Sequence, residues 1–266
     1  MKTLNLIAAA AAALLLSSCS GNPGVTVVAH RGFWNCDEAG YARNSVAALR
    51  CACEAGFRAS EFDVHISSDS ILVVHHDGII DGKRIEEYPL SEFSEHRLEN
   101  GEPLPTLEDY FRTAVAYPHT ALVLELKEHS TPELEKLAVE KSIGLLKEYG
   151  LFSPDRVLFI SFSIYACEQY AKAASGFTVQ YLEHDYSIAE LAERGINGVD
   201  TEYGWVLEHP EWMEQAKAAG FSTNVWTVDD MDAARRLIDL GVEQITTNKP
   251  DQLRELLKEL GIKESR

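Results

Sequence analysis

Residues 121–149 read ALVLELKEHSTPELEKLAVEKSIGLLKEY and combine the two patterns that decide the fold. The dense apolar run Ala121–Leu126 predicts a strand. At 131–133, threonine can cap a helix, proline suits its first position, and glutamate makes the first turn acidic. The residues that follow place an apolar set on one helical face: Leu134, Leu137, Ala138 and Leu145. A strand followed by an amphipathic helix is the repeating unit of an α/β fold.

The same unit recurs along the chain from Val25 to the last helix, which Pro250 opens. Eight strands are predicted, at Val25–Ala29, Glu61–Ile66, Ala121–Leu126, Val157–Ile160, Thr178–Leu182, Gly198–Thr201, Thr223–Thr227 and Gln244–Thr247. Helices are predicted between them, at 44–55, 131–149, 164–174, 188–194, 210–219 and 229–241. In the first of these helices, Asn44 is the expected N-cap and Gly56 the stop.

Eight repeats in some 240 residues, without an obvious linker, favour one TIM (β/α)8 barrel over residues 25–266. A short insertion is expected after the second strand, with an extended segment at Ile71–His75 and an irregular connection over 77–105. The alternative is a doubly wound open sheet, but no glycine-rich dinucleotide loop follows the first strand.

Composition excludes several classes of protein. Of the 266 residues, 45% are hydrophobic and 25% charged, which excludes a disordered chain. The formal net charge of −18 argues against binding to nucleic acid or to anionic lipid headgroups. A phosphate-bearing substrate is compatible with this net charge if a cation or local basic residues offset it at the site.

The N-terminus has the pattern of a bacterial lipoprotein signal peptide. Residues 1–18 combine Lys2 with an apolar run of about 13 residues, shorter than the roughly 20 that span a bilayer. The sequence LSSC at 16–19 resembles a lipobox, so Cys19 is the expected lipidated residue and 19–24 a tether. The protein is then expected to be exported and held on the cell envelope, periplasmic or surface side, with membrane contact only through this anchor. The alternative is an N-terminal core helix, and the sequence leaves the oligomeric state open.

The remaining cysteines point to no function. Cys36, Cys51, Cys53 and Cys167 could pair in an exported protein, although spacing does not give the pairing. Small, partly buried apolar side chains are the favoured interpretation over a thiolate metal site.

Acidic and basic residues gather at the ends of the predicted strands, where such barrels place their chemistry. Glu61 and Asp63 lie two apart on one strand and so share a face, as do Glu125 and Lys127. If that face is the interior, three carboxylates and one ammonium meet at the mouth. Clustered carboxylates repel one another unless they are protonated or bind a cation, and oxygen ligands favour Mg²⁺ or Ca²⁺ over zinc. The alternative is that each carboxylate pairs with a surface lysine or arginine.

Two histidines have settings suited to acid–base chemistry. His30 directly follows the first strand and precedes Arg31, whose planar fork suits a phosphate, and Gly32, which allows close backbone approach. His75 and His76 are adjacent, so only one of them can face a site. Two histidines flanking a phosphate and a cation can act as general acid and base. The other histidines are expected to be surface or structural: His65, His96, His119, His129, His184 and His209.

These residues closely resemble the glycerophosphodiester phosphodiesterase family. The matching pieces occur in family order over about 30 to 250: Ala29-His30-Arg31-Gly32, Asn44-Ser45, Glu61-x-Asp63, His76-Asp77, Pro105-Thr106-Leu107-Glu108, Leu124-Glu125-Leu126-Lys127, Ser161-Phe162, Val225-Trp226-Thr227 and Ile245-Thr246-Thr247-Asn248-Lys249-Pro250.

The resemblance implies a TIM barrel that hydrolyses deacylated phospholipids to glycerol 3-phosphate and an alcohol. By resemblance, the metal ligands for one Ca²⁺ or Mg²⁺ are Glu61, Asp63 and Glu125; the acid–base pair is His30 and His76; and the substrate-binding residues are Arg31, Lys127 and Trp226. In the family, the glycerol hydroxyl is thought to attack first and to give a cyclic phosphate that water opens.

The sequence departs from the family at two positions. Arg43 stands where the family usually has glutamate, and Asn248 where it usually has aspartate. These changes bear on metal affinity and on the leaving alcohol more than on the reaction. Two alternatives remain: a phospholipase C- or D-like relative on the same barrel, and a binding lipoprotein without activity.

Overall fold

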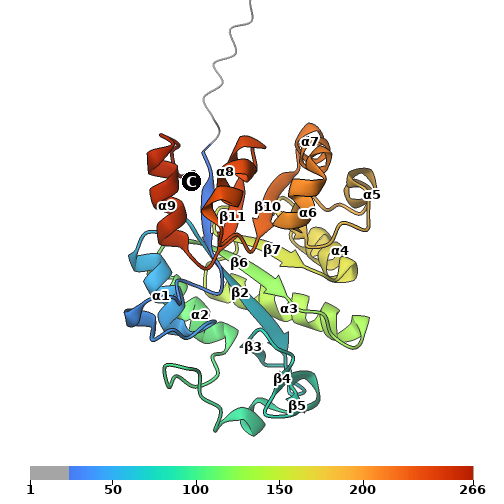
Figure 1. Ribbon diagram of the computed structural model, residues 1–266. Helices are drawn as coiled ribbons and strands as arrows, with labels where there is room; N and C mark the ends of the chain where they lie inside the picture. The colour runs from blue at the N-terminus through green and yellow to red at the C-terminus, as the bar shows by residue number, and fades with distance from the viewer. Residues whose placement is uncertain (1–23, 266) are drawn as a thin grey trace, which may run out of the picture.

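The computed structural model describes residues 24–265 (Figure 1). The expected signal peptide at 1–18, the expected lipidated Cys19 and all of the tether except Gly24 lie outside the described residues. Within the described part of the chain, no helix is long and apolar enough to cross a membrane.

A closed barrel of eight parallel strands forms the centre of the described chain. In sequence order the barrel strands are β1 (Thr26–Ala29), β2 (Ala59–Ile66), β6 (Ala121–Leu126), β7 (Val157–Ser161), β8 (Val179–Tyr181), β9 (Gly198–Glu202), β10 (Ser222–Trp226) and β11 (Gln244–Thr247). Each pairs with the next, and β1 pairs with both β2 and β11, which closes the cylinder. The predicted TIM barrel is confirmed, and the open sheet is wrong because an open sheet ends in two edge strands, whereas each of these eight strands pairs with a neighbour on both sides.

Helices lie outside the strands, and their apolar faces pack on the barrel (Figure 1). Their bounds are α1 (Val46–Glu54), α2 (Leu107–Ala114), α3 (Pro132–Glu148), α4 (Ile164–Ala173), α5 (Ile188–Glu193), α6 (Tyr203–Glu208), α7 (Pro210–Ala218), α8 (Met231–Asp239) and α9 (Pro250–Glu259), with a 3-10 helix η1 (Asp37–Ala39) before α1. Thr131 caps α3 as predicted, by accepting from the backbone N–H of Leu134.

The helix between β2 and β6, α2, was not predicted. Its N-cap Thr106 accepts from the backbone N–H of Asp109, and Asp109 accepts from the N–H of Thr106 in return. This capping box was readable in the sequence as threonine followed three residues later by an acid. The short helix α6 was also missed.

The insertion after β2 builds a small layer of its own at one end of the barrel, at the bottom of Figure 1. It contains β3 (Leu72–Val74), antiparallel to β2, the hairpin β4 (Ile79–Ile80) and β5 (Lys83–Arg84), and two 3-10 helices, η2 (Ile85–Glu87) and η3 (Leu90–Phe93). A separate apolar cluster holds it together: Val73, Ile80, Ile85, Phe93 and Leu104. The predicted extended segment is confirmed as β3, and it carries His75 and His76 to the edge of the barrel mouth.

The N-cap prediction for α1 is wrong. Ser45 is the N-cap, accepting from the N–H of Ala48, whereas Asn44 lies one residue earlier with φ of 54°. The Asn44 side chain turns inward and donates to Asp63 at 2.7 Å. Asparagine tolerates this left-handed conformation better than most residues.

The four cysteines within the described residues, Cys36, Cys51, Cys53 and Cys167, are free thiols. Cys51, Cys53 and Cys167 are buried, in agreement with the interpretation as small apolar side chains.

Candidate active site

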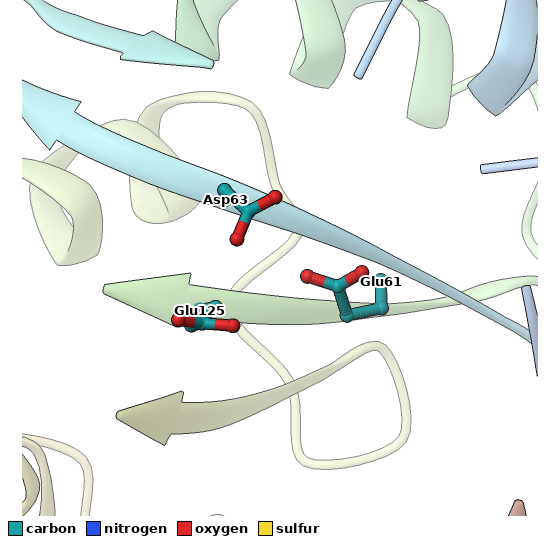
Figure 2. Close-up of side chains that lie close together, drawn as sticks. All are labelled: Glu61, Asp63 and Glu125. Atoms are coloured by element: carbon teal, nitrogen blue, oxygen red, sulfur yellow. The ribbon is translucent and has the colours of Figure 1, made fainter. Parts of the chain in front are cut away.

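Three carboxylates meet inside the mouth of the barrel. Glu61 and Asp63 project from β2 toward Glu125 on the neighbouring β6, as Figure 2 shows. Asp63 is paired directly with Glu125 in the strand register, and one carboxylate oxygen from each of the three residues lies within 4.8 Å of the others. All three side chains are buried. The alternation of the strands therefore brings the predicted acids to one place.

Two cationic side chains border these acids. The Lys127 Nζ lies 2.6 Å from Glu125 Oε1 and 3.2 Å from Asp63 Oδ1. The Arg31 Nε lies 3.5 Å from Asp63 Oδ2, and the Arg31 backbone N–H donates to Glu61 Oε2 at 2.8 Å. The acids thus pair with partly buried cations of the site, and the alternative of separate surface ion pairs is wrong.

The site separates the three acids by their pKa values. Burial and the neighbouring Asp63 raise the pKa of Glu125 to about 7, and the same two causes, with Glu125, raise the pKa of Glu61 well above its usual value. Burial would also raise the pKa of Asp63, but Lys127 and Arg31 outweigh it and hold that pKa below the usual range. Asp63 is therefore the permanently charged member.

The arrangement fits a hard divalent cation. Glu61 Oε1 is buried and has no hydrogen-bond partner among the described residues. An unpaired buried carboxylate oxygen beside two further carboxylates is costly, and a cation bound there would satisfy it. Because the three candidate ligands are all oxygens, the donor set suits Mg²⁺ or Ca²⁺.

Cation affinity is expected to depend on pH, because a ligating carboxylate must lose its proton. With the pKa of Glu125 at about 7 and that of Glu61 also raised in the metal-free protein, the apparent affinity for Mg²⁺ should rise at least about fivefold from pH 6 to pH 7 and continue to rise toward pH 8. Calorimetric titration at the three pH values, in buffers of different ionisation enthalpy, measures both the affinity and the proton release. An affinity that is the same at pH 6 and pH 8 would contradict this proton linkage.

His30 is held in one tautomer by its neighbours. Its Nδ1 is 2.9 Å from Asn248 Oδ1, and the Arg31 Nε donates to its Nε2 at 3.2 Å. Since an amide oxygen only accepts, Nδ1 carries the proton and Nε2 the lone pair. Burial, with a contribution from Arg31, lowers the pKa of His30 to about 4. At neutral pH this imidazole is uncharged and able to accept a proton.

Asn248 belongs to a chain of hydrogen bonds that begins at His30. Its Oδ1 also accepts from Trp34 Nε1 at 3.0 Å, and its Nδ2 donates to Asp229 Oδ2 at 2.8 Å. A carboxylate, Asp229, therefore stands one hydrogen bond further from His30 than Asn248 does. The other departure, Arg43, stacks its guanidinium on Trp34, 4.5 Å from the ring centre.

His76 reaches the site from the segment that follows β3. Burial lowers the pKa of His76, and the carboxylate of Asp77, whose Oδ1 lies 2.7 Å from His76 Nδ1, orients the ring and offsets only part of this lowering. Buried His65 lies beneath it, with Nε2 3.2 Å from the His76 carbonyl oxygen. The expected structural role of His65 fits this contact.

A cavity of about 260 Å³ joins these groups. Its lining residues are His30, Arg31, Glu61, His76, Glu125, Lys127, Ile160, Phe162, Leu182, Asp200, Trp226, Thr227 and Thr246. Seven of the eight predicted site residues thus face one space, and the eighth, Asp63, lies against Lys127 and Arg31 behind it. Trp226 forms part of the wall, edge-on to Phe162, and its Nε1 donates to the Asp200 carbonyl oxygen at 3.0 Å.

The role expected for Gly32 is different in the structure. Gly32 has φ of 80°, and a Cβ there would come within 2.7 Å of the Ala48 backbone. The glycine therefore allows the loop after β1 to pack on α1, which positions His30 and Arg31.

Three proteins with known names are similar to this chain. A glycerophosphodiester phosphodiesterase from Parabacteroides distasonis is 38% identical, with a TM-score of 0.86 over 91% of this chain and 100% of that chain. A glycerophosphodiester phosphodiesterase of Caldanaerobacter subterraneus subsp. tengcongensis is 27% identical over 88% of this chain and 98% of its own. The fold also matches a phosphodiesterase of Oleispira antarctica in complex with the product sn-glycerol-3-phosphate, at 24% identity and a TM-score of 0.75 over 88% of this chain and 97% of that chain.

The sequence model of the glycerophosphoryl diester phosphodiesterase family matches residues 30–252, a range that includes every residue of the cavity. This match and the named relatives exclude the interpretation as a binding protein without activity. The chain belongs to the glycerophosphoryl diester phosphodiesterase family and is an enzyme that hydrolyses glycerophosphodiesters.

Proposed function

We propose that the enzyme cleaves glycerophosphodiesters to glycerol 3-phosphate and an alcohol, with one Mg²⁺ or Ca²⁺ on Glu61, Asp63 and Glu125 and with two histidines as acid and base. The observation that carries this proposal is that one cavity is lined by acids, cations and both histidines. The product in the Oleispira antarctica structure supports the direction of cleavage.

Charge stabilisation comes from the side of the cavity that β1, β2 and β6 form. When bound, the cation would supply Lewis-acid stabilisation of the charge that develops on the phosphoryl oxygens. Arg31 and Lys127 line the cavity beside the acids, so their guanidinium and ammonium groups are placed to bind and orient the phosphate.

The two histidines differ in a way that assigns their roles in this proposal. His30 is uncharged at neutral pH, because its pKa is lowered to about 4, and its lone pair lies on Nε2, so it is assigned as the base that takes the proton from the attacking hydroxyl. Burial lowers the pKa of His76, and its carboxylate partner on Nδ1, Asp77, offsets part of this and orients the ring, so His76 is assigned as the acid that gives a proton to the leaving oxygen. The second step, in which water opens a cyclic phosphate, reverses these roles.

The Asn248–Asp229 pair is expected to hold the base in position. Asn248→Ala should lower kcat by about 100-fold, because His30 loses its Nδ1 partner and small displacements of a catalytic group are costly. The double variant Asn248→Asp with Asp229→Asn keeps one amide and one carboxylate in the pair and should retain activity within about tenfold. Steady-state kinetics gives kcat of both variants for comparison with the wild type. Full activity in Asn248→Ala would show that His30 is positioned without this pair.

The products decide between this function and a phospholipase-like one. The full chain, incubated with Mg²⁺ or Ca²⁺ and followed by ³¹P NMR, is expected to release glycerol 3-phosphate from glycerophosphocholine, glycerophosphoethanolamine and glycerophosphoinositol. The relative rates then rank the alcohols. Accumulation of a cyclic phosphate as the final product, or cleavage of an intact phospholipid instead, would favour the phospholipase C- or D-like alternative.

We also propose that the protein is exported and that a lipid on Cys19 is its contact with the membrane. The support is the sequence of residues 1–19, with a charged start, a short apolar run and a lipobox-like end. In a bacterial host, the wild-type chain should be recovered with membranes and Cys19→Ser in the soluble fraction. Equal distribution of the two proteins would contradict the anchor.

A further inference from the structure

The two sides of the cavity differ in chemistry. The residues from β1, β2 and β6 are charged or titratable, and both cations lie there. The wall at the ends of β7, β8 and β10 is mostly apolar, with Ile160, Phe162, Leu182 and Trp226, and the hydroxyl side chains Thr227 and Thr246 complete the lining. A glycerophosphodiester must place its phosphate on the charged side, so the carbon chain of its glycerol is left to face the apolar wall.

Asp200 interrupts this apolar wall. It lies on β9, is 1% exposed, and is the only residue with an ionisable side chain that β7 to β10 contribute to the described lining. Its Oδ1 has no hydrogen-bond partner among the described residues. A buried polar atom without a partner is costly, and at a ligand cavity it marks a place where a ligand can supply the missing bond.

The protonation state of the Asp200 carboxyl suits a hydrogen bond with a hydroxyl group. Burial and the charge of Glu125 raise its pKa well above the usual value, and the neighbouring Asn224 amide offsets this only in part. A neutral carboxylic acid both donates and accepts a hydrogen bond, as a hydroxyl does. Besides the candidate ligand Glu61, three other barrel side chains, Ser60, Gln180 and Gln244, also leave an oxygen unpaired among the described residues, but none of the three lines this cavity.

We propose that Asp200 is a specificity residue that hydrogen-bonds the terminal hydroxyl of the substrate's glycerol, the hydroxyl furthest from the phosphate. The inference rests on the proposed function, because it takes glycerol as the part of the diester that fills the cavity. Trp226 supports the arrangement, since its Nε1 bond to the Asp200 carbonyl oxygen fixes the ring beside the carboxyl. A substrate without that hydroxyl would leave Asp200 unpaired and be rejected.

The test compares two diesters with the same ethanolamine leaving group. One is glycerophosphoethanolamine, and the other carries propane-1,2-diol, which keeps the attacking hydroxyl and lacks the terminal one. The wild-type full chain with Mg²⁺ is expected to prefer the glycerol substrate at least about tenfold in kcat/KM, because sites built to bond a hydroxyl reject analogues that lack it. Equal kcat/KM values of the wild-type enzyme for the two diesters would by themselves overturn the proposal. No cleavage of either diester would instead overturn the proposed function.

Variants then identify the residue responsible. In Asp200→Ala, the preference should fall by at least about tenfold while the propanediol diester is cleaved within about threefold of the wild-type rate. Asp200→Asn, which fits the same space and still donates and accepts, should keep most of the preference. Ser222→Ala, which removes a hydroxyl from the interior outside the cavity lining, should leave the preference unchanged. Equal loss on both diesters in Asp200→Ala, or an unchanged preference, would overturn the proposal.

Discussion

Replacement of His30 by glutamine is expected to lower kcat for release of glycerol 3-phosphate by about 100- to 10,000-fold, the usual contribution of a general base. Glutamine can keep a hydrogen bond to Asn248, but its amide cannot take a proton at the position of Nε2. The measurement is kcat at saturating Mg²⁺ and substrate.

Two comparisons make this result specific. Mg²⁺ affinity should change little in His30→Gln, because the imidazole is not among the three candidate ligands and Nε2 lies 3.9 Å from Glu61 Oε2. His184→Gln is the matched control: this half-exposed ring stacks on Trp205 away from the cavity and should leave kcat unchanged. A fall in kcat of less than tenfold in His30→Gln would show that His30 is not the general base.

Asp63→Asn is expected to abolish cation binding and activity and to destabilise the protein. Asp63 Oδ1 and Oδ2 face Lys127 and Arg31, and Asn44 donates to it. Breaking a buried charge cluster by removing one partner costs about 3–5 kcal/mol. Cation affinity should fall more than about 100-fold, since even the loss of an outer partner of a metal ligand costs about 10–100-fold.

Calorimetric titration with Mg²⁺ and thermal unfolding in EDTA measure the two effects separately. Asp155→Asn is the control, because this exposed carboxylate lies at a different cavity, outside the site. If Asp63→Asn bound Mg²⁺ as tightly as the wild type does, the Asp63 carboxylate would not be a ligand of the cation.

The barrel and most of the site could be predicted from local patterns in the sequence. The apolar run Ala121–Leu126 could be read as a strand because its burial is nearly complete, and the caps at Thr131 and Pro132 are local signals. The meeting of Glu61, Asp63 and Glu125 follows from strand alternation once the strands are parallel neighbours.

Other features depend on contacts between distant parts of the chain. Asn44 resembles a helix cap in sequence, but its side chain instead donates a hydrogen bond to Asp63, 19 positions later in the chain. Asp229 becomes the partner of Asn248 only because the loops after β10 and β11 meet at the mouth. Asp200 lies near the end of the predicted strand Gly198–Thr201, but its lack of a hydrogen-bond partner depends on which side chains the neighbouring strands place beside it.

The insertion after β2 was predicted only in outline. Its hairpin and 3-10 helices are two to four residues long, too short to show a period. Its core, which includes Val73 and Phe93, forms from residues about 20 positions apart in an otherwise irregular segment.

The most direct test of the central claim is removal and restoration of the cation. The full chain, treated with EDTA and freed of chelator, is assayed for glycerol 3-phosphate release from glycerophosphoethanolamine before and after addition of Mg²⁺ or Ca²⁺. Loss of activity on chelation and recovery with one of the two cations, in the wild type but not in Glu125→Gln, is the expected result. Full activity after chelation, with cation content verified as absent, would contradict a metal-dependent site at Glu61, Asp63 and Glu125.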